Sequence, residues 1–152
     1  MKSVKIQFKL FKINNFLETT LFLALMPKII RNANILLVKD VKKSAAYFVE
    51  KCGFKDPTFY GESETFCMLH RDCAELMLSQ APEDYEIVPY WKVNDKLWNI
   101  YYWVDDVEAL YQEMKNAGAE IDYGLCDQPW GCREFGIQDL DEHDIAFGQD
   151  MN

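Results

Sequence analysis

The feature that most constrains the fold of this chain is an internal repeat, in which a strand, an aspartate, a helix and a glycine follow one another twice. The first copy has Asp40 before a helical pattern and Gly53 after it, and the second copy has Asp106 and Gly118 in the same places. Aspartate commonly caps the start of a helix, and glycine commonly ends one. Because the pattern returns after about 65 residues, the sequence predicts two modules of similar structure.

Each module is expected to contain one strand, one helix and then three more strands. Module one covers residues 32–80, and its elements are predicted over residues 34–38, 41–51, 54–60, 65–69 and 74–78. Module two covers residues 97–150, and its first elements are predicted over residues 97–104, 106–116 and 119–123. A linker over residues 81–96, interrupted by prolines, joins the two modules. The sequence therefore predicts an α+β fold with a βαβββ repeat.

A hairpin is predicted to complete module two, from Pro129 to Gln149. It opens with the run PWGCREF, which begins with a turn at Trp130 and Gly131. A short acidic connector, residues 139–143, then separates two extended runs. Connectors of this length commonly join antiparallel strands, so the pattern predicts the last two strands of the module.

Residues 1–31 do not fit the repeat and are treated as an N-terminal extension of the single domain at residues 32–152. The apolar run near residue 21 is too short to span a bilayer, and no typical cleavage site for a secretory signal follows it. Two interpretations stay open. The extension is an appended segment with Met26 as the true initiator, or residues 17–25 form a helix that packs on the body or on a second subunit.

The charge of the chain limits its partners. The formal net charge is -9, although residues 1–31 are basic, so the body is strongly acidic. An acidic body repels phosphate backbones and attracts cations, which argues against nucleic acid and favours a cationic ligand. Solubility alone is the alternative explanation of the acidity. No membrane partner is expected.

The five cysteines show no C-x-x-C spacing. An odd number without paired spacing argues against a disulfide framework and against a zinc ribbon. Free cysteines are typical of a reducing compartment, so the sequence predicts a cytoplasmic protein.

The repeat and the PWGCREF hairpin together resemble the glyoxalase, bleomycin-resistance and dioxygenase superfamily, also called vicinal oxygen chelate proteins. The resemblance covers about residues 32–150 and implies that the two modules form a curved mixed sheet around a cup. One departure lies in the hairpin turn, which reads Asp-Leu-Asp-Glu-His where the family usually has Asp-Pro-x-Gly-Asn.

The metal-dependent members of this superfamily carry ligands on the first and last strand of each module. The resemblance places those positions at Ala33, Met77, Asn99 and Ala146. A divalent catalytic site needs anionic or imidazole donors, which these side chains do not supply. Both histidines, His70 and His143, are expected in hairpin turns away from the cup. We therefore expect no metal and no other cofactor.

The remaining candidate is a binding cup. Side chains alternate along a strand, so Asn99, Tyr101 and Trp103 share one face of the strand predicted over residues 97–104. The opposite face is expected to pack beneath the helices with Trp98, Ile100 and Tyr102. Large aromatic side chains beside an amide suit a planar ligand, although core packing explains them equally well.

Three further residues are candidates for the rim of the cup. Trp91 lies in the linker and Trp130 lies at the turn that enters the last hairpin. Arg133 has two possible roles, an ion pair with an acidic neighbour or an anchor for a ligand anion, and we favour the ion pair.

The function implied by the resemblance is that of a metal-free, bleomycin-resistance-like protein, in which a homodimer binds and sequesters a small cationic or aromatic compound. One alternative is a metal-dependent lyase or dioxygenase of the same fold. A second is a degenerate structural or interaction domain with a filled cup. Glu75 and Glu134 form a possible acid/base pair, but exposed charges on strands are the more common explanation, and no catalytic residue is assigned.

Overall fold

The computed structural model describes residues 29–95 and 97–152. Residues 32–152 form one compact unit, which is distinct from Met1–Arg31. The expectations for a helix at residues 17–25 and for an initiator at Met26 concern residues outside those described.

The elements of the compact unit follow the predicted order. Module one contains β1 (Ala33–Val38), α2 (Val41–Cys52), β2 (Lys55–Tyr60), β3 (Phe66–Arg71) and β4 (Ala74–Gln80). Module two contains β5 (Ile100–Trp103), α4 (Val107–Ala117), β6 (Glu120–Asp127), β7 (Cys132–Gln138) and β8 (Asp144–Asp150). The linker carries a short helix that the sequence did not predict, α3 (Tyr90–Val93).

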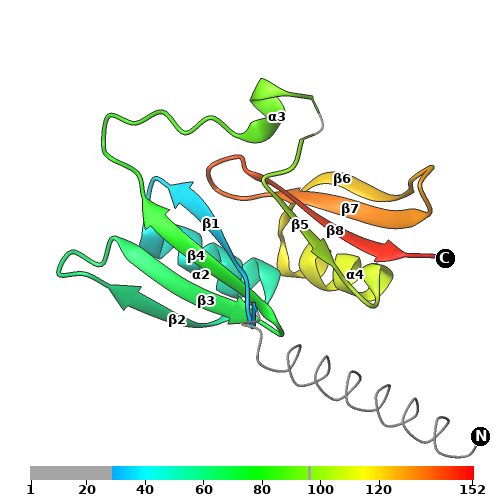
Figure 1. Ribbon diagram of the computed structural model, residues 1–152, viewed down its shortest axis with the longest axis horizontal. Coiled ribbons are helices and arrows are strands. Elements are labelled where there is room, and N and C mark those ends of the chain that lie inside the picture. Colours follow the sequence, from blue (N-terminus) through cyan, green and yellow to red (C-terminus); the bar gives the residue numbers. More distant parts are fainter. Residues whose placement is uncertain (1–28, 96) are drawn as a thin grey trace, which may run out of the picture. The chain divides into compact units, whose positions relative to one another are not determined.

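The eight strands form two four-stranded mixed sheets with identical topology (Figure 1). Sheet A has the strand order β1-β4-β3-β2, and sheet B has the matching order β5-β8-β7-β6. The first strand of each module pairs in parallel with the last, and the other pairs are antiparallel. The α+β fold with two βαβββ modules is therefore confirmed.

The two aspartates and two glycines that flank the helices of the repeat have the predicted roles. The carboxylate of Asp40 accepts hydrogen bonds from the backbone N–H groups of Lys42 and Lys43 at the start of α2, and Asp106 accepts one from that of Ala109 in α4. Gly53 and Gly118 end these helices with left-handed backbone angles, φ 68° and 80°. Glycine adopts such angles without the steric cost of a Cβ atom, which explains its choice at both ends.

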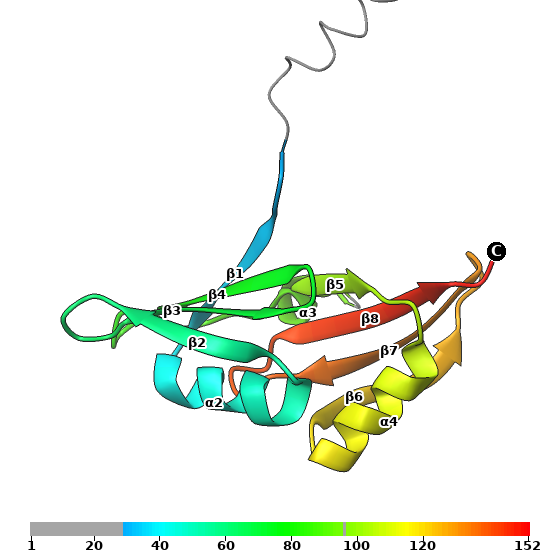
Figure 2. The same cartoon turned by 90° about the horizontal axis from the view of Figure 1, so that it is seen from below.

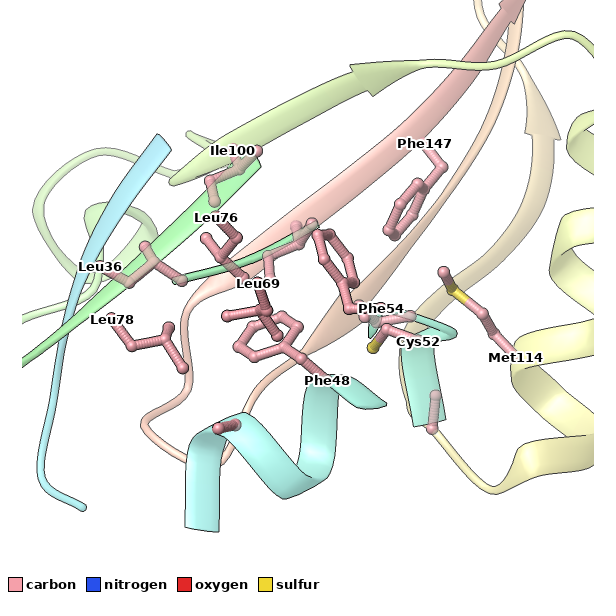
Figure 3. Close-up of a cluster of buried hydrophobic side chains, with 14 of the residues drawn as sticks. Leu36, Phe48, Cys52, Phe54, Leu69, Leu76, Leu78, Ile100, Met114 and Phe147 are labelled. Carbon is pink, nitrogen blue, oxygen red and sulfur yellow. The ribbon is translucent and has the colours of Figure 1, made fainter. Parts of the chain in front are cut away.

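Each long helix covers one face of its own sheet, and the opposite face of that sheet has no helix over it in the part of the chain described (Figure 2). The buried side chains beneath α2 and α4 belong to one continuous hydrophobic core shared by both modules. Figure 3 shows part of this core, in which Phe48 and Phe54 from module one and Phe147 from module two belong to one cluster of buried side chains. The rings of Phe48 and Phe54 meet edge to face, whereas Phe135 and Phe147 stack at 5.2 Å. Burial of such a side chain stabilises a fold by about 1.5–3 kcal/mol.

The turn between β7 and β8 ties module two to module one. Asp139 is buried and accepts hydrogen bonds from the backbone N–H groups of Asp141 and His143 and shares one with the Nδ1 atom of His143. Asp141 in turn accepts a hydrogen bond from the backbone N–H of Lys39 in module one, at 3.1 Å. His143 lies in the predicted turn and is buried, whereas His70 lies within β3 and not in a turn as expected.

Within the described residues, no helix has the length and apolar character needed to cross a membrane.

Candidate functional site

The centre of the candidate site is Glu134, which lies on the face of sheet B opposite α4; we call this the open face. Its side chain is 0% exposed and accepts hydrogen bonds from four side chains of module two, the weakest of them from the Cys132 thiol at 3.9 Å. The Tyr101 hydroxyl donates to Oε2 at 2.8 Å, while the Tyr123 hydroxyl and the Gln128 amide donate to Oε1 at 3.1 and 2.8 Å. The sequence interpretation that Glu134 lies on an exposed strand face is therefore wrong. Glu75, the other residue of the possible acid/base pair, lies on β4 of sheet A, whereas Glu134 lies on β7 of sheet B.

A pocket of about 560 Å³ lies next to this carboxylate. Its lining combines aromatic side chains, acidic side chains and one amide. The lining residues are Trp98, Asp122, Tyr123, Gln128, Pro129, Trp130, Glu134 and Asp144. Three of these are carboxylates, and none of these described lining residues is a lysine, an arginine or a histidine.

Burial and the neighbouring acids shape the ionisation of the site. Burial, followed by contact with Cys132 and Glu134, raises the pKa of Tyr101 far above its usual value. Burial and the charge of Glu134 do the same to the pKa of Tyr123. Both phenols therefore stay protonated and act as hydrogen-bond donors. Burial also raises the pKa of Asp144, which accepts a hydrogen bond from the Gln138 amide and lies near the carboxylate of Asp122.

The aromatic residues of β5 are not among the residues that line the pocket beside Glu134. Tyr101 is half-buried, and its ring lies 5.1 Å from that of Trp98 and 5.1 Å from that of Trp103. Trp103 is 64% exposed and lines another open hollow, of about 490 Å³, with Val104 and Asp105.

Trp98 was expected beneath the helices, but it lines the pocket beside Glu134. The prediction is wrong because β5 begins only at Ile100, so strand alternation does not extend back to Trp98. Ile100 and Tyr102 do pack on the helix side, as expected.

Among the other predicted site residues, Trp130 lines the pocket, whereas Asn99 and Trp91 are not among its lining residues. Trp130 is exposed on the rim of the pocket. Asn99 accepts a hydrogen bond from the backbone N–H of Tyr90 in α3, and Trp91 donates one from its indole to the backbone carbonyl of Glu142. These two residues therefore join the linker to module two.

Arg133 makes ion pairs with two acidic side chains of module two. Its Nε lies 3.2 Å from Glu108, and its Nη1 lies 3.2 Å from Asp127. This is the favoured of the two roles considered from the sequence.

The residues that the resemblance places at the family's metal-ligand positions do not fit a divalent ion. Ala33 and Ala146 offer no donor atom, Met77 offers only a thioether and Asn99 a neutral amide. Within the described residues, no group of three or more histidine, cysteine or acidic side chains has an arrangement suited to a metal. No chemical step through a metal is therefore derived for this site.

A family model described as the Glyoxalase/Bleomycin resistance protein/Dioxygenase superfamily matches residues 29–147. The chain belongs to this superfamily. Its two βαβββ modules agree with this membership.

Solved structures of the superfamily resemble the chain over most of its length. A bleomycin-binding protein from Streptomyces verticillus, solved with copper(II)-bleomycin, is 24% identical with a TM-score of 0.61, over 80% of this chain and 97% of that protein. A glyoxalase-related enzyme from Clostridium phytofermentans is 17% identical with a TM-score of 0.64, over 82% and 97%.

A third similar structure, a glyoxalase/bleomycin resistance protein/dioxygenase from Alicyclobacillus acidocaldarius, is 14% identical with a TM-score of 0.65, over 80% of this chain and 92% of that protein. At these identities the likeness shows the fold, and it includes both a binding protein and an enzyme-related one. The comparison with curated proteins gave no match.

Proposed function

We propose that this protein binds and sequesters a small cationic aromatic compound in the pocket beside Glu134, without metal chemistry. The observation that carries the proposal is the buried carboxylate of Glu134, which is surrounded by neutral donors from Tyr101, Tyr123 and Gln128. A buried charge is costly unless it is paired with an opposite charge. A cationic ligand supplies the missing positive charge.

The lining of the pocket supports the same chemistry. Asp122 and Asp144 add two more carboxylates, and Trp98 and Trp130 offer indole surfaces around the same space. Indole rings attract cations over their faces and stack on planar groups. A compound with a flat ring and an attached positive group uses both features at once.

The enzyme alternatives have less support. A lyase or dioxygenase of this superfamily with a catalytic metal needs donors that Ala33, Met77, Asn99 and Ala146 do not supply. Glu134 is a poor general base for a substrate, because four side chains already donate hydrogen bonds to its oxygens. The filled-cup alternative conflicts with a pocket of about 560 Å³ beside these residues.

A homodimer is part of the proposal. On β1, Ile35 is 64% exposed and Leu37 is also exposed, although both are large apolar residues. β1 and β5 each have one hydrogen-bonded neighbour among the described strands, so each presents an unpaired edge. Exposed apolar strand edges are normally covered by another chain.

A cytoplasmic location also remains part of the proposal. The five cysteines are free thiols, and three of them, Cys52, Cys67 and Cys132, are buried in the fold. Free thiols persist in a reducing compartment.

The test is a titration with a matched pair of compounds, an arylamidine and the neutral arylamide of the same shape. Quenching of tryptophan fluorescence reports binding, because Trp98 and Trp130 line the pocket. We expect saturable binding of the arylamidine that is at least about tenfold tighter than that of the amide, a difference of about 1.4 kcal/mol. A bleomycin-type glycopeptide extends the panel to a larger cationic aromatic ligand.

Two tryptophan variants locate the site. Trp98→Ala removes a pocket wall and is expected to weaken arylamidine binding, whereas Trp103→Ala, which lies in the other hollow, is expected to leave it unchanged. Equal binding of the charged and neutral compounds by the unmodified protein, or no binding of either, would contradict the proposal.

A further inference from the structure

Three glycines lie within the strands of sheet B, where glycine is normally disfavoured, and two of them lie beneath the tyrosines of the site. Gly136 lies on β7 and Gly148 on β8, and both face the open side of the sheet. Neither has the positive φ angle found at Gly53, Gly61, Gly118 and Gly131. Their backbone conformation therefore does not require glycine. The reason for glycine at these two positions must lie in the space above them.

That space is filled by the two tyrosines of the site. A Cβ atom at Gly136 would overlap the ring of Tyr123, its partner on the neighbouring strand. A Cβ atom at Gly148 would overlap the hydroxyl of Tyr101 and would come within 2.8 Å of the Cys132 sulfur. The two rings therefore occupy the positions that side chains at Gly136 and Gly148 would take.

The placement of the glycines explains how both hydroxyls reach one carboxylate. Gly148 is the direct cross-strand partner of Glu134, and Gly136 lies two residues beyond Glu134 on the same face of β7. The Tyr101 side chain starts on β5, two strands away from β7, and passes over Gly148 to reach Glu134. Tyr123 arrives from the opposite side, on β6, over Gly136.

We propose that Gly136 and Gly148 are specificity-determining residues. They let Tyr123 and Tyr101 lie against the sheet, where the two hydroxyls surround Glu134 with neutral donors. As a result, the pocket selects compounds with a permanent positive charge over neutral compounds of the same shape. The inference rests on the proposed function and adds the chemical class of ligand, an amidinium or a quaternary ammonium group attached to an aromatic ring. Gly136 and Gly148 act through the tyrosines and are positioning residues.

The physical reason for the charge selection is the nature of the donors. Tyr101, Tyr123 and Gln128 replace the water that a buried carboxylate loses, but they bring no positive charge. The negative charge therefore stays uncompensated beside the pocket. If a methyl group displaces either tyrosine, the displaced ring enters the pocket and water replaces the lost donor. The protein then discriminates less between ligands of different shape and between charged and neutral ligands.

The test compares Gly136→Ala and Gly148→Ala with Gly124→Ala as the matched control. Gly124 lies on β6 of the same sheet, and a Cβ atom there meets only the Tyr111 hydroxyl, at an ordinary contact distance of 3.6 Å. For each folded variant, the arylamidine and the neutral arylamide are titrated as above. We expect the ratio of the two affinities to fall about tenfold in the first two variants, as for loss of one hydrogen bond to a charged group, and to stay unchanged in the control.

A spectroscopic readout separates positioning from a general loss of stability. Tyrosinate absorbance at 295 nm is followed against pH, with Tyr123→Phe and Tyr101→Phe used to assign the two residues. Displacement from Glu134 removes one cause of their raised pKa values, so each tyrosine is expected to ionise at lower pH in its glycine variant. The Gly124→Ala protein is expected to titrate like the parent.

If Gly136→Ala or Gly148→Ala does not fold, Tyr123→Phe and Tyr101→Phe serve in its place, because they remove the donor without any overlap. The same fall in charge selection is then expected. A folded variant with unchanged selectivity and unchanged tyrosine ionisation overturns the inference. Failure of the parent protein to prefer the arylamidine overturns the proposed function instead, and the tyrosine titration still decides the positioning role.

Discussion

Tyr101 and Glu134 lie on strands separated by β8, yet the Tyr101 hydroxyl donates a 2.8 Å hydrogen bond to the Glu134 carboxylate. The intervening strand carries Gly148 at the crossing point, so no side chain blocks the contact. The two residues are 33 positions apart in the chain, and Glu134 has no exposed surface. This contact is the basis of the first prediction.

Replacement Glu134→Gln is expected to weaken binding of the arylamidine by about ten- to a hundredfold, because it removes a negative charge while it keeps the shape of the side chain. The free energy of unfolding is expected to change by less than about 1 kcal/mol, since the loss of a buried charge offsets a poorer hydrogen-bond pattern. Calorimetric titration and urea denaturation measure the two effects. Gln128→Glu is a counterpart with the opposite change of charge, and weaker arylamidine binding in both variants would contradict the charge argument.

Replacement Asp144→Asn is expected to stabilise the protein at neutral pH. Burial raises the pKa of Asp144 above its unfolded value of 3.8, so the folded state disfavours the ionised form. The cost is present above the raised pKa and disappears as the pH falls through it towards 3.8. Asparagine keeps the acceptor for the Gln138 amide without the charge.

The measurement for Asp144 is thermal unfolding of both proteins between pH 7 and pH 3.5. The advantage of Asp144→Asn is expected to shrink as the pH falls, and a pH-independent difference would argue against a titrating Asp144. Over the same range, the parent protein is expected to lose affinity for the arylamidine as Asp144 becomes protonated.

The capping aspartates are expected to matter equally in the two modules. Asp40→Ala and Asp106→Ala each remove a side-chain acceptor at a helix start, which costs about 1 kcal/mol of stability. Asp105→Ala, next to the second cap, is the control and is expected to cost less than about 0.5 kcal/mol. Urea denaturation distinguishes the three proteins, and equal effects of Asp105→Ala and Asp106→Ala would contradict the capping role.

The proposed dimer is expected to depend on β1. Ile35→Lys places a charge on the exposed apolar edge and is expected to convert a dimer into a monomer, as measured by sedimentation velocity. Val93→Lys changes an equally exposed apolar residue in α3 and is expected to leave the dimer intact. A parent protein that sediments as a monomer at high concentration would exclude the dimer.

Local patterns in the sequence predicted most of the fold. Asp40 with Gly53 and Asp106 with Gly118 marked both helices correctly, because capping depends on residues within a few positions of the helix end. The connector between β7 and β8 was also predicted correctly, since short acidic loops between extended runs are local signals. The short helix α3 was missed because only four residues form it.

The site was predicted less completely. Tyr101 was a candidate from its place in an aromatic strand, and its hydroxyl does bond to Glu134, but Tyr101 is not among the residues that line the pocket. Glu134 was interpreted as exposed because a charged residue in a strand is usually solvated. Trp98 was assigned to the helix side of the sheet, although it lines the pocket. Strand alternation alone places Cys132, Glu134 and Gly136 on one face of β7, but it does not show what lies over them.

The sequence by itself determined the two βαβββ modules and the acidic character of the body, because caps, turns and alternation are properties of neighbouring residues. Only the tertiary structure decided that Tyr101, Tyr123 and Gln128 meet at Glu134. These side chains come from separate segments, and the pairing of β5 with β8 and of β7 with β6 brings them together. Gly136 and Gly148 leave room for two tyrosine rings above the sheet, a relation between strands that no local pattern contains.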